Sequence, residues 1–111
     1  MEDDETLKRV LTDGGFGRKV GEYEDKTVLM GTEKKDDEFC VVVYWNDIES
    51  DEGVQIATVD NSHGQTVHVD KYRDGEKVER EDVGSEVSTV YGAEQYVKEN
   101  WRALSEFHFS K

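Results

Sequence analysis

The stretch Phe39-Cys40-Val41-Val42-Val43-Tyr44-Trp45 is an unbroken apolar run. Because successive side chains of a strand point to opposite faces, a strand built from this run would be apolar on both faces. A strand of this kind lies at the centre of a sheet that is covered, at least in part, on both sides. We therefore predict that residues 39–45 form the central strand of a sheet, and we place the other elements around it.

Polar and apolar residues alternate in shorter segments before and after this run. Before it, residues 20–23 and 27–30 are predicted strands joined by a short turn, and residues 31–38 are a predicted polar connection. After it, residues 46–53 are a predicted acidic loop, and residues 54–59 are the next predicted strand.

Residues 66–73 and 76–80 are two further extended segments, and they flank the dipeptide Asp74-Gly75. Asp-Gly between two such segments is a strong signal for a two-residue hairpin turn, because glycine adopts positive φ without steric cost. Connections this short favour antiparallel neighbours. The sequence therefore predicts an antiparallel sheet of about five or six strands.

Helical periodicity occurs near both ends of the chain. After Ser85, apolar residues recur at helical spacing and predict a long helix that covers one face of the sheet. Near the N-terminus, Asp3 or Asp4 can cap a short helix that ends at about residue 11. The first stripe comprises Val87, Val90, Tyr91, Val97, Trp101 and Leu104, and the second comprises Leu7, Val10 and Leu11. The predicted fold is a single α+β domain, residues 1–111, with a short N-terminal helix and a longer C-terminal helix packed on one face.

The composition is polar for a folded protein, with 37% charged residues, 34% hydrophobic residues and a formal net charge of -13. Aromatic residues make up 10% of the chain and the apolar residues are clustered, which argues against disorder. The acidic excess is spread along the whole chain, which favours a halophile's cytoplasm, where concentrated salt screens the repulsion. Two alternatives stay open: a basic partner protein that neutralises the surface, or an ordinary acidic protein.

The single cysteine, Cys40, excludes an internal disulfide, and its place inside the apolar run indicates a buried thiol. No apolar stretch reaches the ~20 residues that a membrane span needs. The acidic residues from Glu2 to Glu5 are the opposite of the start of a signal peptide. We therefore expect a cytoplasmic protein that does not enter the membrane.

Ionisable residues gather between positions 60 and 73, a segment that holds His63 and His68. If residues 66–73 form a strand, His68 and Asp70 point to the same face of it, because side chains alternate. Asp60 and His63 lie on the loop that enters this strand. Two imidazoles and two carboxylates can therefore converge at one end of the sheet.

This combination of groups suits acid–base chemistry. Imidazole titrates near neutral pH, and a neighbouring carboxylate fixes its tautomer and raises its pKa. We predict His63 and His68 as the acid–base pair, with Asp60 and Asp70 as the residues that orient them. The predicted substrate contacts are Asn61, Lys71, Tyr72 and Arg73, with Lys71 or Arg73 stabilising phosphate charge.

Two other interpretations of the segment stay open. Asp, Asn, Ser and Gly at positions 60–64 are also good loop-forming residues, and His68 on an outward face can simply be solvated. Alternatively, His63, His68 and a carboxylate could bind a divalent transition metal. The spacing of the two histidines is not a recognised zinc pattern, so we expect chemistry without a metal or another cofactor.

The order of an aromatic-ended central strand, a following strand, and then Asp60-Asn61-Ser62-His63-Gly64 and His68-Val69-Asp70 resembles the TumE-like toxins of archaeal and bacterial toxin–antitoxin pairs. The resemblance spans about residues 20–104 and rests on the Asp-Asn-x-His core. It implies a small α+β toxin that pairs with a helix-turn-helix, DNA-binding antitoxin. The chain departs from that family at Gly64, where a second histidine is common.

Two hypotheses about function follow. In the first, the chain is a toxin-like, metal-independent ribonuclease whose histidine pair cleaves RNA; its acidic surface repels phosphate unless the salt concentration is high. In the second, it is a non-enzymatic acidic interaction module that binds a basic partner protein. Assembly as a homodimer is compatible with both hypotheses.

Overall fold

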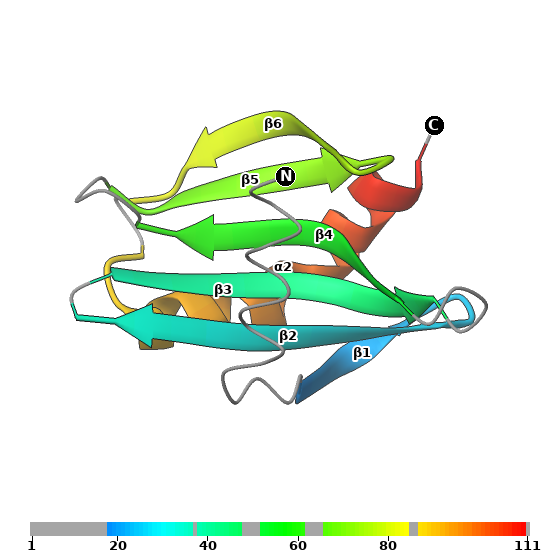
Figure 1. Ribbon diagram of the computed structural model, residues 1–111, viewed down its shortest axis with the longest axis horizontal. Coiled ribbons are helices and arrows are strands. Elements are labelled where there is room, and N and C mark those ends of the chain that lie inside the picture. Colours follow the sequence, from blue (N-terminus) through cyan, green and yellow to red (C-terminus); the bar gives the residue numbers. More distant parts are fainter. Residues whose placement is uncertain (1–17, 37, 48–51, 62–65, 85–86, 111) are drawn as a thin grey trace.

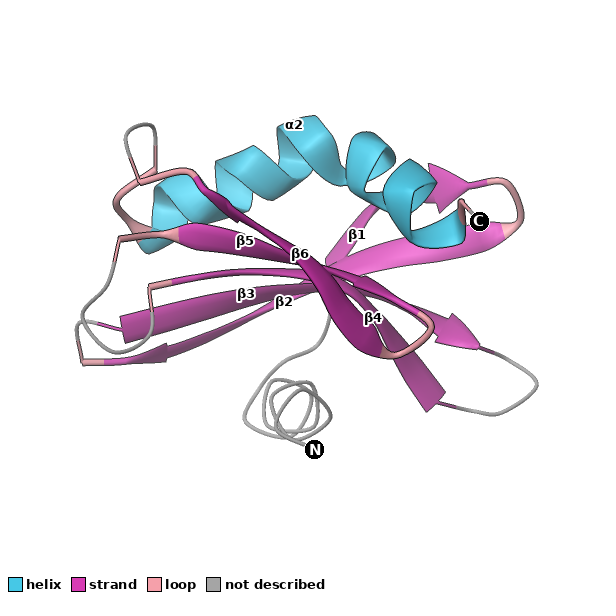
Figure 2. Ribbon diagram, turned by 90° about the horizontal axis from the view of Figure 1, so that it is seen from above, coloured by secondary structure: helices cyan, strands magenta, loops and turns pink. Residues whose placement is uncertain are grey.

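The structure is a computed structural model that describes residues 18–36, 38–47, 52–61, 66–84 and 87–110. The six strands form one antiparallel sheet in the order β1-β2-β3-β4-β5-β6, so each strand pairs with its neighbours in the sequence (Figure 1). The helix α2 crosses one face of this sheet (Figure 2). The elements are β1 (Arg18–Tyr23), β2 (Lys26–Lys35), β3 (Glu38–Asp47), β4 (Glu52–Asp60), β5 (His68–Arg73), β6 (Glu76–Asp82) and α2 (Val90–Phe109).

This architecture confirms the predicted α+β class, the antiparallel sheet and the long C-terminal helix. The predicted N-terminal helix, with its stripe of Leu7, Val10 and Leu11, lies outside the described residues. No helix in the described part of the chain is both long enough and apolar enough to cross a membrane.

The central strand β3 is buried on both faces, as the apolar run predicts. Val41 and Val43 point toward α2 and belong to the main core. Val42 and Tyr44 point the other way and are also buried, in a smaller cluster with Cys40. We call the side of the sheet opposite α2 the helix-free face.

β2 is longer than the sequence indicated. Part of the predicted polar connection at residues 31–38 continues β2 as far as Lys35, and Asp36 turns the chain with a φ of 54°. The pairing of residues 31–35 with β3 satisfies the backbone groups of both strands. Hydrogen bonding to β3 therefore outweighs the polar character of the local side chains, which is all that sequence patterning registers.

The predicted acidic loop at residues 46–53 is shortened for the same reason. β3 continues to Asp47 and β4 begins at Glu52, and these two residues are paired with each other. In the opposite direction, the predicted strand at residues 66–73 begins only at His68.

The hairpin predicted at Asp74-Gly75 is confirmed. Asp74 and Gly75 have φ values of 55° and 81°, and Arg73 pairs with Glu76 across the turn. Two consecutive residues of positive φ match the twist of the flanking strands and close β5 onto β6.

α2 begins later than the periodicity suggested. Thr89 has an extended backbone, with a φ of -129°, and its side chain accepts a hydrogen bond from the Gly92 N–H at 3.0 Å. This N-cap starts the helix at Val90 and sets which residues face the sheet. Val97 and Leu104 are buried as predicted, but Tyr91, assigned to the same stripe, is exposed.

Gly21 of β1 allows α2 to approach the sheet closely. A Cβ atom at position 21 would lie within 2.6 Å of two indole atoms of Trp101, Cε2 and Cη2. Hydrogen is therefore the only side chain that fits beneath Trp101 without displacing it.

We expect Gly21→Ala to destabilise the fold by about 1–3 kcal/mol, because overpacking at this contact forces α2 or β1 to move. Urea unfolding followed by tryptophan fluorescence measures the effect. Glu22→Ala, at an exposed position in the same strand, is the matched control and should change stability little. Equal stability of Gly21→Ala and the parent chain would contradict the close contact.

His108, near the end of α2, is a buried neutral residue that joins the helix to two strands. Its Nδ1 lies 2.9 Å from the Tyr72 carbonyl oxygen, and its Nε2 lies 3.4 Å from Trp45 Nε1. The tautomer with a proton on Nδ1 satisfies both contacts. Burial lowers the pKa of His108 below its ordinary value of 6.5 and outweighs the Tyr72 bond, which raises it.

This pKa shift predicts a pH dependence of stability. As the pH falls below about 6.5, the unfolded chain binds a proton at His108 that the folded chain does not, so the free energy of unfolding decreases. His108→Gln cannot take up that proton. Its melting temperature should therefore fall less than that of the parent chain between about pH 7.5 and pH 5. Parallel pH profiles for the two proteins in thermal unfolding would rule out this role for His108.

Candidate functional site

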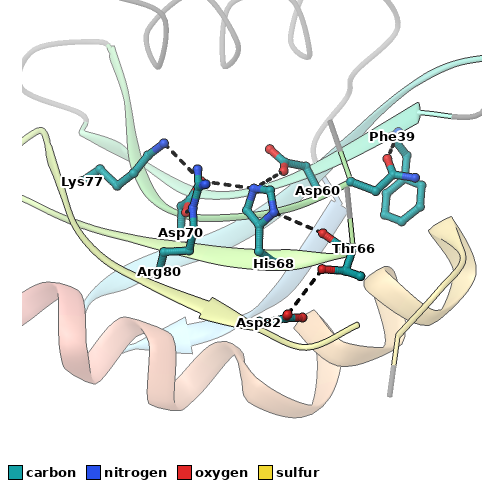
Figure 3. Close-up of polar contacts among 9 residues, drawn as sticks. Phe39, Asp60, Thr66, His68, Asp70, Lys77, Arg80 and Asp82 are labelled. Atoms are coloured by element: carbon teal, nitrogen blue, oxygen red, sulfur yellow. Dashed lines mark hydrogen bonds and ion pairs between the residues drawn. The ribbon is translucent and has the colours of Figure 1, made fainter. Parts of the chain in front are cut away.

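The polar residues of the candidate site come from three neighbouring strands. Asp60 of β4 pairs with His68 of β5, and β5 in turn places Asp70 opposite Arg80 of β6. All four side chains point to the helix-free face, where they meet as a cluster (Figure 3). Together with Lys77, we call them the ionic cluster.

His68 and Asp60 form the closest contact of the cluster. His68 Nε2 lies 2.6 Å from Asp60 Oδ1, and His68 Nδ1 lies 3.3 Å from the Thr66 carbonyl oxygen. Both ring nitrogens therefore face acceptor oxygens, and a neutral imidazole has one N–H to donate, either from Nε2 to Asp60 or from Nδ1 to Thr66. Nε2 acts as a base only when another group takes the place of Asp60 Oδ1 beside it.

Asp70 is buried and is compensated by two cations. Its carboxylate accepts hydrogen bonds from Arg80 Nε at 2.7 Å and Arg80 Nη2 at 3.2 Å, and Lys77 Nζ lies 3.2 Å away. Burial raises the pKa of Asp70, but the bonds from Arg80 and Lys77 outweigh it and hold that pKa below its ordinary value of 3.8. Asp70 therefore carries a negative charge that fixes the two cations beside His68.

A β-bulge creates this arrangement. Next to the turn, Arg73 pairs with Glu76 and Tyr72 pairs with Lys77. Val78 then has no partner on β5, so the pairing beyond it is shifted by one residue. Without that shift, Asp70 would face Glu79, and two like charges would lie side by side. The bulge instead places Arg80 opposite Asp70.

Lys77 and Arg80 are the site residues that sequence reasoning missed. The Asp74-Gly75 turn was recognised, and a two-residue turn fixes the register next to it, so Lys77 could have been placed opposite Tyr72. The position of Arg80 opposite Asp70 could not have been predicted, because a bulge carries no clear sequence signal in a strand whose seven residues are all exposed.

Lys71 and Arg73, predicted to contact substrate phosphate, are not brought to the cluster. They point to the opposite face of the sheet, toward the end of α2. Arg73 Nη2 donates to the Phe107 carbonyl at 3.1 Å, and Lys71 Nζ lies 3.0 Å from Glu79 Oε2. Both cations also lie over the Phe107 ring. These contacts attach the helix to β5, so we do not propose either residue as a phosphate ligand.

None of the remaining predicted site residues is described as part of the ionic cluster. Asn61 Oδ1 accepts a hydrogen bond from the Phe39 N–H at 2.8 Å, which extends the pairing at the end of β3. Tyr72 shares the face of His68, as alternation predicts, but its side chain is buried. His63 lies outside the described residues.

Asp60, His68 and Asp70 are also the group within the described ranges that could hold a metal ion, with ligand atoms within 4.8 Å of one another. One imidazole and two carboxylates suit a divalent transition metal. Arg80 and Lys77 already occupy the Asp70 oxygens, however, and a metal would have to displace them.

Comparison with known proteins identifies a family. The family model described as "Domain of unknown function (DUF7718)" matches residues 1–110. No curated protein and no solved structure matches the chain.

The ionic cluster should contribute to stability. Arg80→Ala leaves the buried Asp70 carboxylate with Lys77 alone, and we expect a loss of about 2 kcal/mol. This is less than the roughly 3–5 kcal/mol typical of a fully buried pair, because Arg80 is half exposed. Urea unfolding measures the loss, with the exposed Lys34→Ala as the matched control.

The double variant Asp70→Asn with Arg80→Ala separates the charge from the packing. Removing the carboxylate removes the uncompensated charge, so the double variant should be more stable than Arg80→Ala alone. Since the pKa of Asp70 is lowered on folding, its contribution is present above about pH 4 and is lost as the pH falls through the folded pKa. Asp70→Asn should therefore lose less stability below pH 4 than the parent chain. A double variant that is less stable than Arg80→Ala would refute the explanation that the loss of stability comes from the Asp70 charge.

Proposed function

From the geometry of a chain that belongs to the DUF7718 family, we propose a toxin-like protein that cleaves RNA with His68 as its acid–base group. The observation that carries the proposal is the 2.6 Å contact between His68 Nε2 and Asp60 Oδ1, with two cations close by. In the tautomer with its proton on Nδ1, a ribose 2′-hydroxyl that takes the place of Asp60 Oδ1 at Nε2 gives its proton to that nitrogen, and Asp60 beside it stabilises the imidazolium that results. The 2′-oxygen then attacks the adjacent phosphorus.

Arg80 and Lys77 stabilise the charge that develops on the phosphate. Their side chains are 52% and 38% exposed, so both can reach a ligand on the surface. Arginine has five N–H donors, and the Asp70 carboxylate takes one from Nε and one from Nη2, which leaves three for a ligand. In this proposal these two residues replace Lys71 and Arg73 at the phosphate.

His63 is the proposed second acid–base group, which protonates the leaving 5′-oxygen. This assignment rests on the sequence, where His63 lies between Asn61 and Thr66 on the segment that enters β5. By the resemblance to TumE-like toxins, we further propose a cytoplasmic protein of a halophile that is neutralised by a helix-turn-helix antitoxin. Concentrated salt allows RNA to approach a chain of net charge -13.

RNA cleavage by the purified chain tests the mechanism. We expect His68→Ala to reduce the rate by about 100-fold or more, as for the loss of a general acid–base group. Lys77→Ala should also reduce it, whereas Lys71→Ala, on the other face, should not. Unlike most nucleic-acid-binding proteins, the chain should work better in about 1–2 M KCl than in 0.1 M KCl. Cleavage by folded His68→Ala at the parental rate would sink the mechanism, and cleavage abolished by EDTA would point to a metal instead.

A second candidate function is an acidic module that binds a basic partner protein. It is favoured by β6, a seven-residue strand at the edge of the sheet whose residues are all exposed, including Val78. Such an edge can pair with an extended segment of another chain. A basic protein that copurifies with the chain, binds His68→Ala normally and is lost with Glu76→Lys would favour this function over catalysis.

A further inference from the structure

A pocket of about 620 Å³ opens on the α2 side of the sheet, at the end of β5 that lies away from His68. There the last turn of α2 lies beside the hairpin that joins β5 to β6 (Figure 1). The lining comes from β3, β4, this hairpin and the end of α2. The volume is typical of sites that bind small molecules, so we examine which ligand the lining would recognise.

Three apolar side chains form one wall of the pocket. Trp45 and Val54 are cross-strand partners on β3 and β4, and the Phe109 ring lies 5.6 Å from the Trp45 ring between centroids. The indole is held in place, because Trp45 Nε1 donates to His108 Nε2 at 3.4 Å and His108 Nδ1 contacts the Tyr72 carbonyl oxygen. This wall is formed before a ligand arrives, and it suits the apolar part of a ligand.

Arg73 brings a positive charge to the pocket. Its Nε and Nη2 lie 3.3 Å and 3.1 Å from the Phe107 carbonyl oxygen, and Nη2 also donates to Ser110 Oγ at 3.1 Å. These neutral partners fix the guanidinium and leave the N–H groups of Nη1 for a ligand. Among the described residues no carboxylate pairs with Arg73, whereas Arg18 is paired with Glu94. An anionic group of a ligand can take that place.

Asp74 brings a negative charge to the same pocket, from an exposed position in the turn. Within the described chain it forms no ion pair with Arg73 or with another cation. Burial is the main influence on the pKa of His108 and lowers it. To a smaller extent, the Asp74 charge raises that pKa and the Arg73 charge lowers it, so both charges act at the pocket wall where His108 lies. A simple anion would be repelled by Asp74, and a simple cation by Arg73.

We propose that this pocket binds a free α-amino acid with an aromatic side chain. The α-carboxylate accepts hydrogen bonds from Arg73 Nη1, and the α-ammonium group donates to the Asp74 carboxylate. The aromatic ring packs against Trp45 and Val54. An amino acid carries its two charges on one carbon atom, as the adjacent Arg73 and Asp74 require. The pocket and the ionic cluster lie on opposite faces of the sheet, so this site is independent of the proposed RNA cleavage.

Calorimetric titration of the full chain with L-phenylalanine tests the proposal. Three analogues each lack one recognised group: phenylacetate has no ammonium group, phenethylamine has no carboxylate, and L-alanine has no ring. We expect each analogue to bind about tenfold more weakly than L-phenylalanine, because it loses a charge-assisted hydrogen bond or the ring contact. The proposal is overturned if L-phenylalanine, L-tyrosine and L-tryptophan all fail to bind, or if an analogue binds as tightly as L-phenylalanine.

Asp74→Asn removes the negative charge and keeps the turn, because asparagine also adopts positive φ and Asn-Gly is a favoured hairpin turn. The variant should bind L-phenylalanine about tenfold more weakly and should bind phenylacetate no more weakly than the parent chain does. Asp36→Asn is the matched control, since Asp36 is also exposed, has a φ of 54° and lies in the turn before β3. It should leave both affinities unchanged. Parental affinity of Asp74→Asn for L-phenylalanine overturns the proposal.

Two-dimensional NMR shows where the amino acid binds. Of the two indole N–H groups, that of Trp45 lies at the pocket, whereas Trp101 packs over Gly21. The Trp45 signal should shift on titration with L-phenylalanine, and the Trp101 signal should not. A shift of Trp101 alone would place the ligand elsewhere and overturn the proposal. His68→Ala should bind L-phenylalanine like the parent chain, whatever its effect on RNA cleavage.

Discussion

Val41 and Val43 of β3 are shielded from water because α2 crosses one side of the sheet, while Val42 and Tyr44 are shielded on the other side. This burial of one strand on both faces is the constraint on which the other elements depend. It places β2 and β4 on either side of β3, and the polar residues at the ends of these strands pair with β3 as part of the sheet. It also requires a helix close enough to the sheet that glycine is needed at position 21 beneath Trp101.

The ionic cluster lies on the same sheet but depends on a local irregularity. The unpaired Val78 shifts β6 by one residue, and that shift brings Arg80 rather than Glu79 to the buried Asp70. A single residue in an exposed edge strand thus decides whether the cluster is charge-balanced. Because Asp70 holds two cations next to the His68–Asp60 pair, the same contacts that stabilise the hairpin also fix positive charge beside that pair.

A chain with a net charge of -13 is an unusual setting for the proposed RNA cleavage. Several cations of the described surface are held in place by carboxylates, as with Lys71 by Glu79 and Arg18 by Glu94. Local positive charge beside His68 therefore has to act within a repulsive field. Concentrated salt weakens that field beyond a few ångströms but leaves direct contacts largely intact, so the local cluster and the overall charge are compatible.

The sequence by itself determined the fold class, the doubly buried strand at residues 39–45, the hairpin at Asp74-Gly75 and the shared face of His68 and Asp70. These follow from side-chain alternation, helical spacing and the steric freedom of glycine, which are all local properties. Only the tertiary structure decided how far the strands extend, where α2 begins, and which cations meet Asp70. Those features depend on pairing between distant segments, where backbone hydrogen bonds and a one-residue bulge outweigh local preference. Side-chain alternation in β5 already directs Lys71 and Arg73 away from His68 and Asp70. That they pack there against the end of α2 was decided only by the tertiary structure, because folding brings this distant segment to β5.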